Sequence, residues 1–275
     1  MMTHLRRPVR QAASRLLARM GYVAVPAGEW QHLRTMRRVH RNDVVEIEEL
    51  YRTFLFPALP RDLGRIDAMH ELHGTSVGEA VHIVHHLHKA LEVEGDVCEF
   101  GCNEGATSRL LAHELLSHAD RNLWLFDSFE GLPAPGKEDR LIDDIGGLGS
   151  IDRYEGTMRA REEQVRTKLE SVGFPAERTR IVKGWIDQTL MGPSVPTQVS
   201  FAYIDFDFYE PIRLALQFLD RVMPPGGVIV VDDYGFFSAG AQAATDEFIA
   251  AAADRYTIHL PLSAAGKFCI CERVA

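Results

Sequence analysis

The sequence predicts an α/β fold built on a mostly parallel sheet with helices on both faces. From residue 96 onward, short apolar runs alternate with segments whose apolar residues recur at helical intervals. This alternation is typical of parallel strands joined by helices. The last two apolar runs, YTIHLPL and KFCICERV, follow one another without a helical segment between them. They predict a closing hairpin in which one strand runs antiparallel to the rest.

Seven strands are expected in this part of the chain, each a short run rich in apolar residues. They are DVCEFG (96–101), NLWLFDSF (122–129), TRIVKGW (179–185), VSFAYIDFD (199–207), VIVVDDYG (228–235), YTIHLPL (256–262) and KFCICERV (267–274). The helices expected between them lie at 105–119, about 158–172, 211–222 and about 241–254.

Residues 1–90 are predicted to form a helical extension, and residues 91–275 the sheet domain. Apolar residues recur at helical spacing in 28–56, and a capped amphipathic helix is expected over 75–91. We expect this extension to cover an acceptor site or to form a subunit contact, most simply in a two-fold homodimer.

The extension also holds nine of the twelve histidines. His82 and His86 are spaced i, i+4 and could hold a metal ion, but no acidic or cysteine partner is interleaved with them. The favoured interpretation is a helix whose imidazoles face solvent or a neighbouring subunit.

The polar, glycine-bearing stretch 132–156 is longer than most connections between elements. Loops of this length are usually functional lids or disordered segments. We expect a lid over an acceptor, with a mobile surface loop as the alternative.

Composition narrows the function classes. The formal net charge is −9 at pH 7, whereas nucleic-acid binders usually carry a basic patch, so no nucleic-acid partner is expected. No apolar run approaches the roughly 18 to 20 residues that cross a bilayer, and the basic start does not match a secretory signal. We therefore expect a cytoplasmic protein without a membrane partner; a membrane-surface helix in the first 25 residues is the alternative.

The four cysteines, Cys98, Cys102, Cys269 and Cys271, lie in apolar segments. Reduced, buried thiols are expected, as fits a cytoplasmic protein. A zinc site built from all four is disfavoured, because C-x3-C with C-x-C matches no usual zinc spacing.

Acidic residues end several of the predicted strands. Asp205 and Asp207 end the fourth strand, and residues i and i+2 of an extended chain point to the same side. Glu99, Asp127 and the pair Asp232–Asp233 end three other strands. Ligands of such sheets gather at the carboxyl ends of the strands. So many carboxylates in one cleft need partners, and a divalent cation satisfies several hard oxygens at once.

The loop after the first strand indicates a nucleoside ligand. Gly101 and Gly105 in EFGCNEGATS do not complete the dinucleotide fingerprint G-x-G-x-x-G, but they allow a ligand to approach the backbone closely. Asp127 ends the next strand, where an acidic side chain binds ribose hydroxyls.

Five motifs carry a resemblance to a known family. GDVCEFGCNEGATS, LWLFDSFEGLP, VKGWIDQTL, YIDFDFYEP and MPPGGVIVVDDYG occur in this order between about residues 90 and 250. Together they resemble the macrocin O-methyltransferase family, which methylates sugar hydroxyls of macrolide and aminocoumarin natural products. The family often reads D-G-D-W-Y where this chain has D-F-D-F-Y. Phe206 therefore adds bulk near the site, and we expect the shape of the acceptor to differ from that of the antibiotic sugars.

The resemblance implies a Rossmann-like class I methyltransferase fold that uses S-adenosylmethionine (SAM). The glycine loop would hold the methionine portion, Asp127 and Ser128 the ribose, and the segment at Gly184 and Trp185 would approach the adenine. The residues implied to contact SAM are Glu99, Gly101, Cys102, Asn103, Gly105, Ser108, Asp127, Ser128, Gly184, Trp185, Asp187 and Asp205.

The resemblance also implies magnesium bound by Asp205, Asp232 and Asp233. A sugar hydroxyl is a poor nucleophile at neutral pH, and coordination to a cation lowers its pKa. We predict Asp207 as the catalytic base, because it shares a face with Asp205 and is not needed for a ligand set of three carboxylates. Two other interpretations stay open: Asp207 caps the next helix, or Asp232 and Asp233 simply begin a turn.

The function expected is therefore a SAM-dependent, magnesium-assisted O-methyltransferase that acts on a hydroxyl of a sugar-bearing small molecule. A catechol or phenol acceptor is the second hypothesis. It is disfavoured because enzymes of the catechol type commonly place a lysine where this chain has Phe208. The third hypothesis is a nucleotide- or metal-binding module without catalysis.

Overall fold

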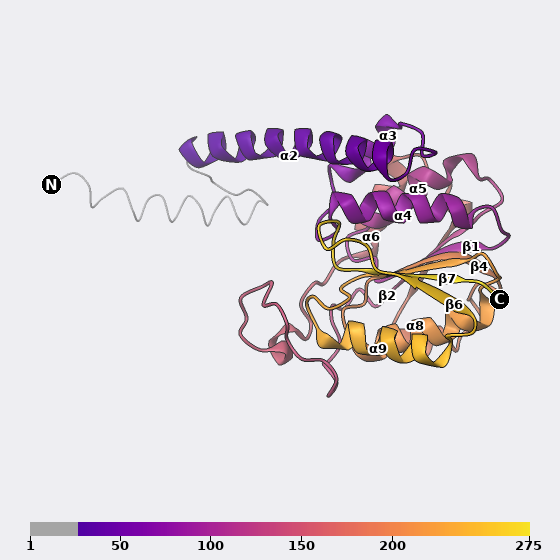
Figure 1. Ribbon diagram of the computed structural model, residues 1–275. Helices are drawn as coiled ribbons and strands as arrows, with labels where there is room; N and C mark the ends of the chain where they lie inside the picture. Colours follow the sequence, from indigo (N-terminus) through magenta and orange to yellow (C-terminus); the bar gives the residue numbers. More distant parts are fainter. Residues whose placement is uncertain (1–26) are drawn as a thin grey trace. The chain divides into compact units, whose positions relative to one another are not determined.

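The computed structural model describes residues 27–275, and the surface helix considered for the first 25 residues lies outside them. The chain divides into two compact units, one that ends at Val45 and one that comprises Glu46–Ala275. Helix α2 (Ala27–Phe54) runs from the first unit into the second, which holds every later element (Figure 1). The functional boundary predicted at residue 90 stays a prediction.

The second unit is built on the predicted seven-stranded sheet. Its strand order is β3-β2-β1-β4-β5-β7-β6. The pairs from β3 to β5 are parallel, whereas β7 is antiparallel to both β5 and β6, which confirms the closing hairpin. The strands are β1 (Asp96–Phe100), β2 (Leu123–Asp127), β3 (Thr179–Lys183), β4 (Val199–Ile204), β5 (Val228–Val231), β6 (Tyr256–His259) and β7 (Cys269–Arg273).

Helices cover both faces of the sheet, with α4 and α5 on one side and α8 and α9 on the other (Figure 1). Side chains of β1 alternate between the two faces of the sheet and so contribute to both apolar cores. Val97 packs on the side of α4 and α5, and Cys98 and Phe100 pack on the side of α8 and α9. The helices are α3 (Leu63–Met69), α4 (Val77–Ala90), α5 (Ala106–Glu114), α6 (Glu162–Ser171), α7 (Ile186–Thr189), α8 (Tyr209–Val222) and α9 (Ala239–Ala251), with short 3-10 turns η1 (Leu115–Ser117), η2 (Ile151–Tyr154) and η3 (Ala176–Arg178).

All four cysteines are buried and free of disulfides, as expected. Among residues 27–275, no cluster with metal-binding geometry contains a cysteine, so the zinc alternative gains no support. Within the same residues, no helix is both long and apolar enough to cross a membrane.

The segment between β2 and α6, predicted as a lid, is anchored to the body of the second unit. Leu141 forms an isolated antiparallel bridge with Ser238, and the Ile142 amide donates to the carbonyl of Phe237 over 3.0 Å. Tyr154 is 2% exposed and packs edge-on against the ring of Phe237. The segment therefore has its own small apolar cluster; whether it moves when ligands bind stays a prediction.

Strand order reverses at β1, which lies between β2 and β4, and the chain leaves β1 through a tight loop. Gly101 adopts φ +88° there, and an added Cβ would overlap the carbonyl oxygen of Asp205. Only glycine combines this backbone conformation with such a close approach. The loop after β1 is thereby held against the loop after β4.

We predict that G101A is far more destabilising than G147A. Gly147 also has a positive φ, +64°, but an added Cβ would meet nothing within 4 Å, so G147A should cost only the backbone strain of about 1–2 kcal/mol. G101A adds the overlap and should at least double that loss. Thermal unfolding of the two variants measures the difference, and equal losses would contradict the close contact between the loops.

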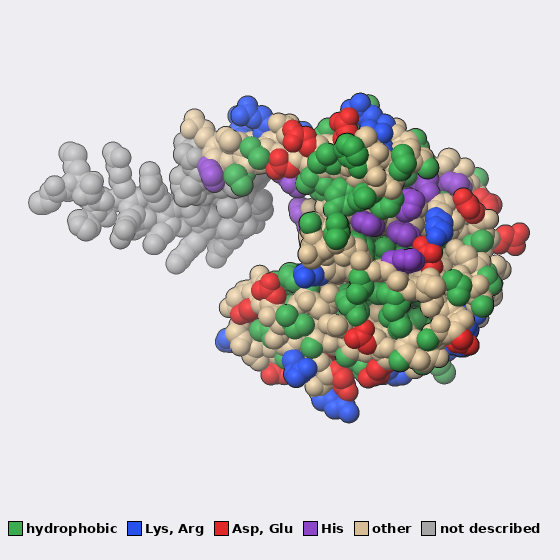
Figure 2. Space-filling model, viewed as in Figure 1, with side chains coloured by type: hydrophobic (Ala, Val, Ile, Leu, Met, Phe, Trp, Pro, Cys, Tyr) green, Lys and Arg blue, Asp and Glu red, His purple; other side chains and the backbone are tan. Residues whose placement is uncertain are grey.

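Histidines gather on one face of the molecule (Figure 2), and four of them, His82, His85, His86 and His88, lie on α4. His86 is buried rather than solvent-facing, which differs from the expectation. Burial first, and then the neighbouring imidazoles, lower the pKa of His86 to about 3 and that of His82 to about 4. Glu272 lies 3.5 Å from His86 Nδ1, but it also binds Lys89 at 2.7 Å, and burial outweighs its attraction.

The buried imidazoles predict that stability falls in mild acid. The pKa of His86 is lower in the folded than in the unfolded state, so the unfolded state binds the extra proton as pH falls from about 6.5 towards the folded value. The loss should approach about 1.4 kcal/mol per pH unit for this residue. H86L should flatten the dependence of unfolding free energy on pH, whereas H40L, at an exposed position, should not. Parallel curves for H86L and the natural protein would contradict a buried, neutral imidazole.

Candidate active site

A cavity of about 520 Å³ opens at the carboxyl ends of the central strands. Its size is within the range usual for cofactor and small-molecule sites. The loops after β1, β2, β4 and β5 all contribute to its wall, as expected where strand order reverses. The predicted site residues that line it are Gly101, Asn103, Asp127, Ser128, Gly184, Trp185, Asp205, Asp207, Asp232 and Asp233.

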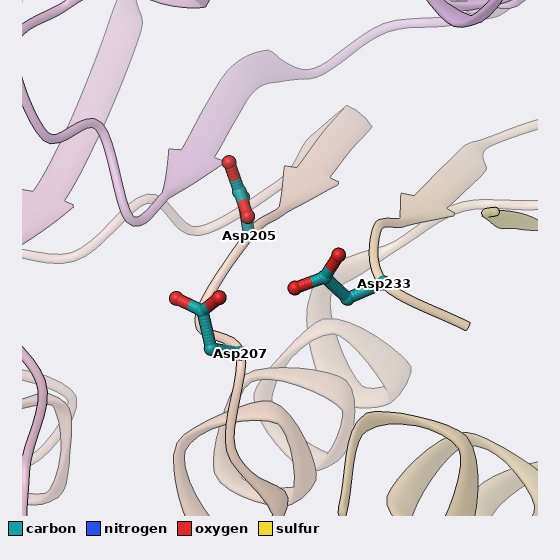
Figure 3. Close-up of side chains that lie close together, drawn as sticks. All are labelled: Asp205, Asp207 and Asp233. Carbon is teal, nitrogen blue, oxygen red and sulfur yellow. The ribbon is translucent and has the colours of Figure 1, made fainter. Parts of the chain in front are cut away.

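Three carboxylates meet on one side of this cavity. Asp205, Asp207 and Asp233 each offer an oxygen, and these oxygens lie within 4.8 Å of one another. Figure 3 shows Asp207 and Asp233 facing one another, with Asp205 beside them. Asp207 and Asp233 have φ of +63° and +55°. Such strain in non-glycine residues persists only where the surrounding structure enforces it, and it is common at functional sites.

The three aspartates are surrounded by negative charge. Burial raises the pKa of Asp205 well above its usual value, and the charges that act on it most strongly are all carboxylates. Burial likewise raises the pKa of Asp207, to about 6, and that of Asp233, and neighbouring carboxylates add to both shifts. Without a cation, burial and mutual repulsion therefore disfavour full ionisation of the cluster.

Asp232, the third predicted metal ligand, does not join this cluster. Its Oδ2 accepts from the Tyr203 hydroxyl over 2.8 Å, and its Oδ1 accepts from the Asp233 amide over 2.8 Å. Glu79 of α4 lies next to it, and burial, followed by the charge of Asp232, raises the pKa of Glu79. The predicted ligand set and the observed cluster thus share Asp205 and Asp233 and differ in the third member.

The donor chemistry of the cluster fits a hard divalent cation. Three carboxylates from two adjacent loops are the ligands that Mg²⁺ or Mn²⁺ prefers. A bound cation would also remove the repulsion that raises the pKa of each member.

The loop after β1 and the end of β2 form a separate polar subsite. The Asn103 amide donates to Asp127 Oδ2 over 2.8 Å, and the Phe129 amide donates to Oδ1 over 2.6 Å. Each carboxylate oxygen keeps a second lone pair that can accept a ligand hydroxyl. The half-buried Asp127 is therefore fixed at the cavity wall with free acceptor capacity.

Five residues predicted to contact the cofactor do not line the cavity. Glu99 is 1% exposed and accepts from the Ser108 hydroxyl, and burial raises its pKa to about 8. Asp187 is exposed on α7. The residues concerned are Glu99, Cys102, Gly105, Ser108 and Asp187.

Several lining residues were missed by sequence reasoning. Ser76 and Glu79 come from the start of α4, and Lys267 from the loop before β7. Their sequence signals, a helix cap and a loop lysine, are indistinguishable from ordinary surface features. The predicted lid segment, 132–156, was a better signal, because it contains three of the missed apolar residues on the wall, Leu132, Pro133 and Ile145, and Met158 follows just after it.

Comparison with known proteins identifies relatives of the chain. A tetracenomycin-C methyltransferase of Streptomyces olivaceus, 8-demethyl-8-(2,3-dimethoxy-alpha-L-rhamnosyl)-tetracenomycin-C 4'-O-methyltransferase, is 34% identical over 145 residues, 52% of this chain and 54% of that protein. Demethyldecarbamoylnovobiocin O-methyltransferase of Streptomyces niveus is 30% identical over 158 residues, 57% of this chain and 58% of that protein. The chain thus spans about half the length of the curated relatives it matches.

Solved structures show the same fold. The O-methyltransferase NovP has a TM-score of 0.61 at 24% identity and covers 72% of this chain and 81% of its own. The calicheamicin methyltransferase CalS11 has a TM-score of 0.54 at 16% identity and covers 92% and 95%. A family model described as Macrocin-O-methyltransferase (TylF) matches residues 73–271, most of the chain. With both the predicted motifs and the sheet topology in agreement, this chain belongs to the macrocin O-methyltransferase family.

Proposed function

We propose that the protein transfers a methyl group from SAM to a hydroxyl of a sugar-bearing small molecule, assisted by a divalent cation. The observation that carries the proposal is the aspartate cluster, which shares one cavity with the glycine loop and Asp127. Family membership and the O-methyltransferase relatives support the reaction class.

The cofactor would lie along the loop after β1. Gly101 lets a ligand approach the backbone, and Asp127 has acceptor capacity for the ribose hydroxyls. Gly184 and Trp185 line the neighbouring wall, where the adenine is expected. A fold relative, the O-methyltransferase TomG from Streptomyces achromogenes, was solved in complex with SAM (TM-score 0.51, 16% identity, 84% of this chain and 96% of that chain).

The cation would be held by Asp205 and Asp233, which belong both to the predicted ligand set and to the observed cluster. Asp232 would be the third ligand, and because it lies outside the cluster it would have to turn towards the cation from its bonds to Tyr203 and the Asp233 amide. When bound, it supplies Lewis acidity towards the acceptor hydroxyl. Asp207 takes the proton of that hydroxyl as general base. Its ligand oxygen lies within 4.8 Å of those of Asp205 and Asp233, close enough to take a proton from a hydroxyl bound beside the cation. Elevation of its pKa by burial brings the carboxylate closer to the working range of a base at neutral pH.

The acceptor would lie against the segment between β2 and α6. Leu132, Ile145 and Met158 offer apolar contacts on this wall, and Phe206 narrows the space beside the aspartates. Phe208 is 1% exposed, so the position at which catechol-type enzymes place a lysine is occupied here by a core side chain. A glycosylated acceptor is therefore favoured over a catechol, and a cytoplasmic homodimer remains the proposed setting.

Titration calorimetry with SAM, with and without Mg²⁺, tests the proposal together with product mass on a panel of glycosides. We expect micromolar SAM binding and a product that is one methyl group heavier only when a divalent cation is present. EDTA should abolish turnover, and Mg²⁺ should restore it. A protein that binds no SAM would exclude both methyltransferase hypotheses and favour the non-catalytic module.

The roles of Asp207 and Asp232 are separable by a matched pair of amide variants. D207N should bind Mg²⁺ nearly as well as the natural protein but lose about 10²–10⁴-fold in kcat, the usual contribution of a general base. D232N should weaken Mg²⁺ binding by at least about tenfold. The reverse pattern, with metal binding lost in D207N and kept in D232N, would assign Asp207 to the metal instead.

A further inference from the structure

Asp139 is a buried carboxylate in the segment between β2 and α6, away from the cavity wall. It is 5% exposed. Its Oδ1 accepts from the Tyr209 amide over 2.8 Å and from the Ser238 hydroxyl over 3.1 Å, and its Oδ2 accepts from the Gly136 amide over 2.8 Å. Burying a carboxylate costs free energy unless such bonds compensate it. The side chain is therefore fixed by three donors.

The first of these bonds caps α8. The residue before the helix is Phe208, whose side chain has no oxygen, and no local side chain caps this end. The Tyr209 amide is one of the donors left without an intrahelical partner, and a negative charge is favourable beside it. Asp139 supplies that acceptor from a position 70 residues away in the sequence.

The second bond ties Asp139 to the start of α9. Ser238 caps this helix by accepting from the Gly240 amide over 3.0 Å while its hydroxyl donates to Asp139. The fit is tight, because a Cβ added to Gly240 would overlap Asp139 Oδ1. The Ala239 amide adds a bond to the Arg140 carbonyl over 2.9 Å.

One carboxylate thus joins the two helices that follow the acidic loops. Asp205 and Asp207 lie directly before α8, and Asp233 lies in the loop before α9. The strained Asp207 is only two residues from Tyr209, the amide that Asp139 holds. A shift of either helix start would change the distances within the cluster.

We propose that Asp139 is a positioning residue for the aspartate cluster: it locks the starts of α8 and α9 together and so sets the spacing of Asp207 and Asp233. The proposal rests on the function proposed above for that cluster. Asp139 would act through the helix starts, without binding the cation, SAM or the acceptor itself. The SAM subsite, built from the loops after β1 and β2, lies outside its contacts.

The test compares D139N with D143N. The D139N substitution keeps the size of the side chain but removes its charge. The NH₂ group of the new amide would face at least one of the three groups that donate to Asp139, so that hydrogen bond would be lost. Asp143 is exposed in the same segment, so D143N removes an equal charge at the surface. We expect D139N to weaken Mg²⁺ binding about 10–100-fold, to lower kcat with little change in acceptor KM, and to leave SAM affinity unchanged. D143N should match the natural protein in all four values.

Amide hydrogen exchange separates this proposal from the function on which it rests. In D139N the amides of Tyr209 and Gly240 should exchange at least about tenfold faster, whether or not a metal binds. Unchanged exchange and unchanged Mg²⁺ affinity in folded D139N would overturn the proposal. A natural protein that binds no Mg²⁺ would refute the proposed function, while exchange still decides the role of Asp139. If D139N does not fold, S238A removes both the Ser238 bond to Asp139 and the Ser238 cap on Gly240. The amide to follow is then that of Tyr209, which Asp139 itself holds, and unchanged exchange at Tyr209 in S238A would refute the lock.

Discussion

The fold brings several carboxylates together at one edge of its sheet, and their mutual repulsion is the main physical constraint on the site. Parallel strands deliver their carboxyl ends to the same side, and the reversal of strand order at β1 leaves a cavity there. Asp205, Asp207 and Asp233 share that space, and Asp232 and Glu79 line the same cavity. Their pKa values rise because burial and like charges disfavour ionisation, and a divalent cation would reverse both effects.

Keeping these groups together requires support from distant parts of the chain. Asp207 and Asp233 both hold left-handed backbone conformations, which the surrounding contacts must enforce. Tyr203 of β4 binds Asp232, and Asp139 of the long segment binds the helix starts beyond both acidic loops. The segment predicted as a lid therefore holds the starts of α8 and α9 through Asp139.

The fold was predictable because each apolar run and each turn follows from local patterns. The seven strands and a closing hairpin with one antiparallel member were predicted from the order of apolar runs and helical segments; the structure shows that this member is β7. The predicted strand 228–235 is too long, because from Asp232 onward the chain leaves the ladder to enter the site. The anchoring of the segment through Leu141 and Ser238 was not predictable, since the two residues lie far apart in the sequence.

The sequence identified which acidic residues lie at the site, but not which of their side chains contact one another. The strand ends with carboxylates gave the edge of the sheet at which the cavity lies and every aspartate on the cavity wall. Which aspartate faces which depends on side-chain rotation and on partners such as Tyr203, and neither leaves a pattern in the sequence. Glu79 was missed because a glutamate in the first turn of a helix is common for reasons of charge alone.

Anomalous scattering from a crystal soaked in Mn²⁺ and S-adenosylhomocysteine tests the central claim most directly. The account predicts one metal peak, with carboxylate oxygens of Asp205 and Asp233 about 2.1 Å from it. No peak at saturating Mn²⁺, with the aspartates protonated or paired to protein groups, would contradict it.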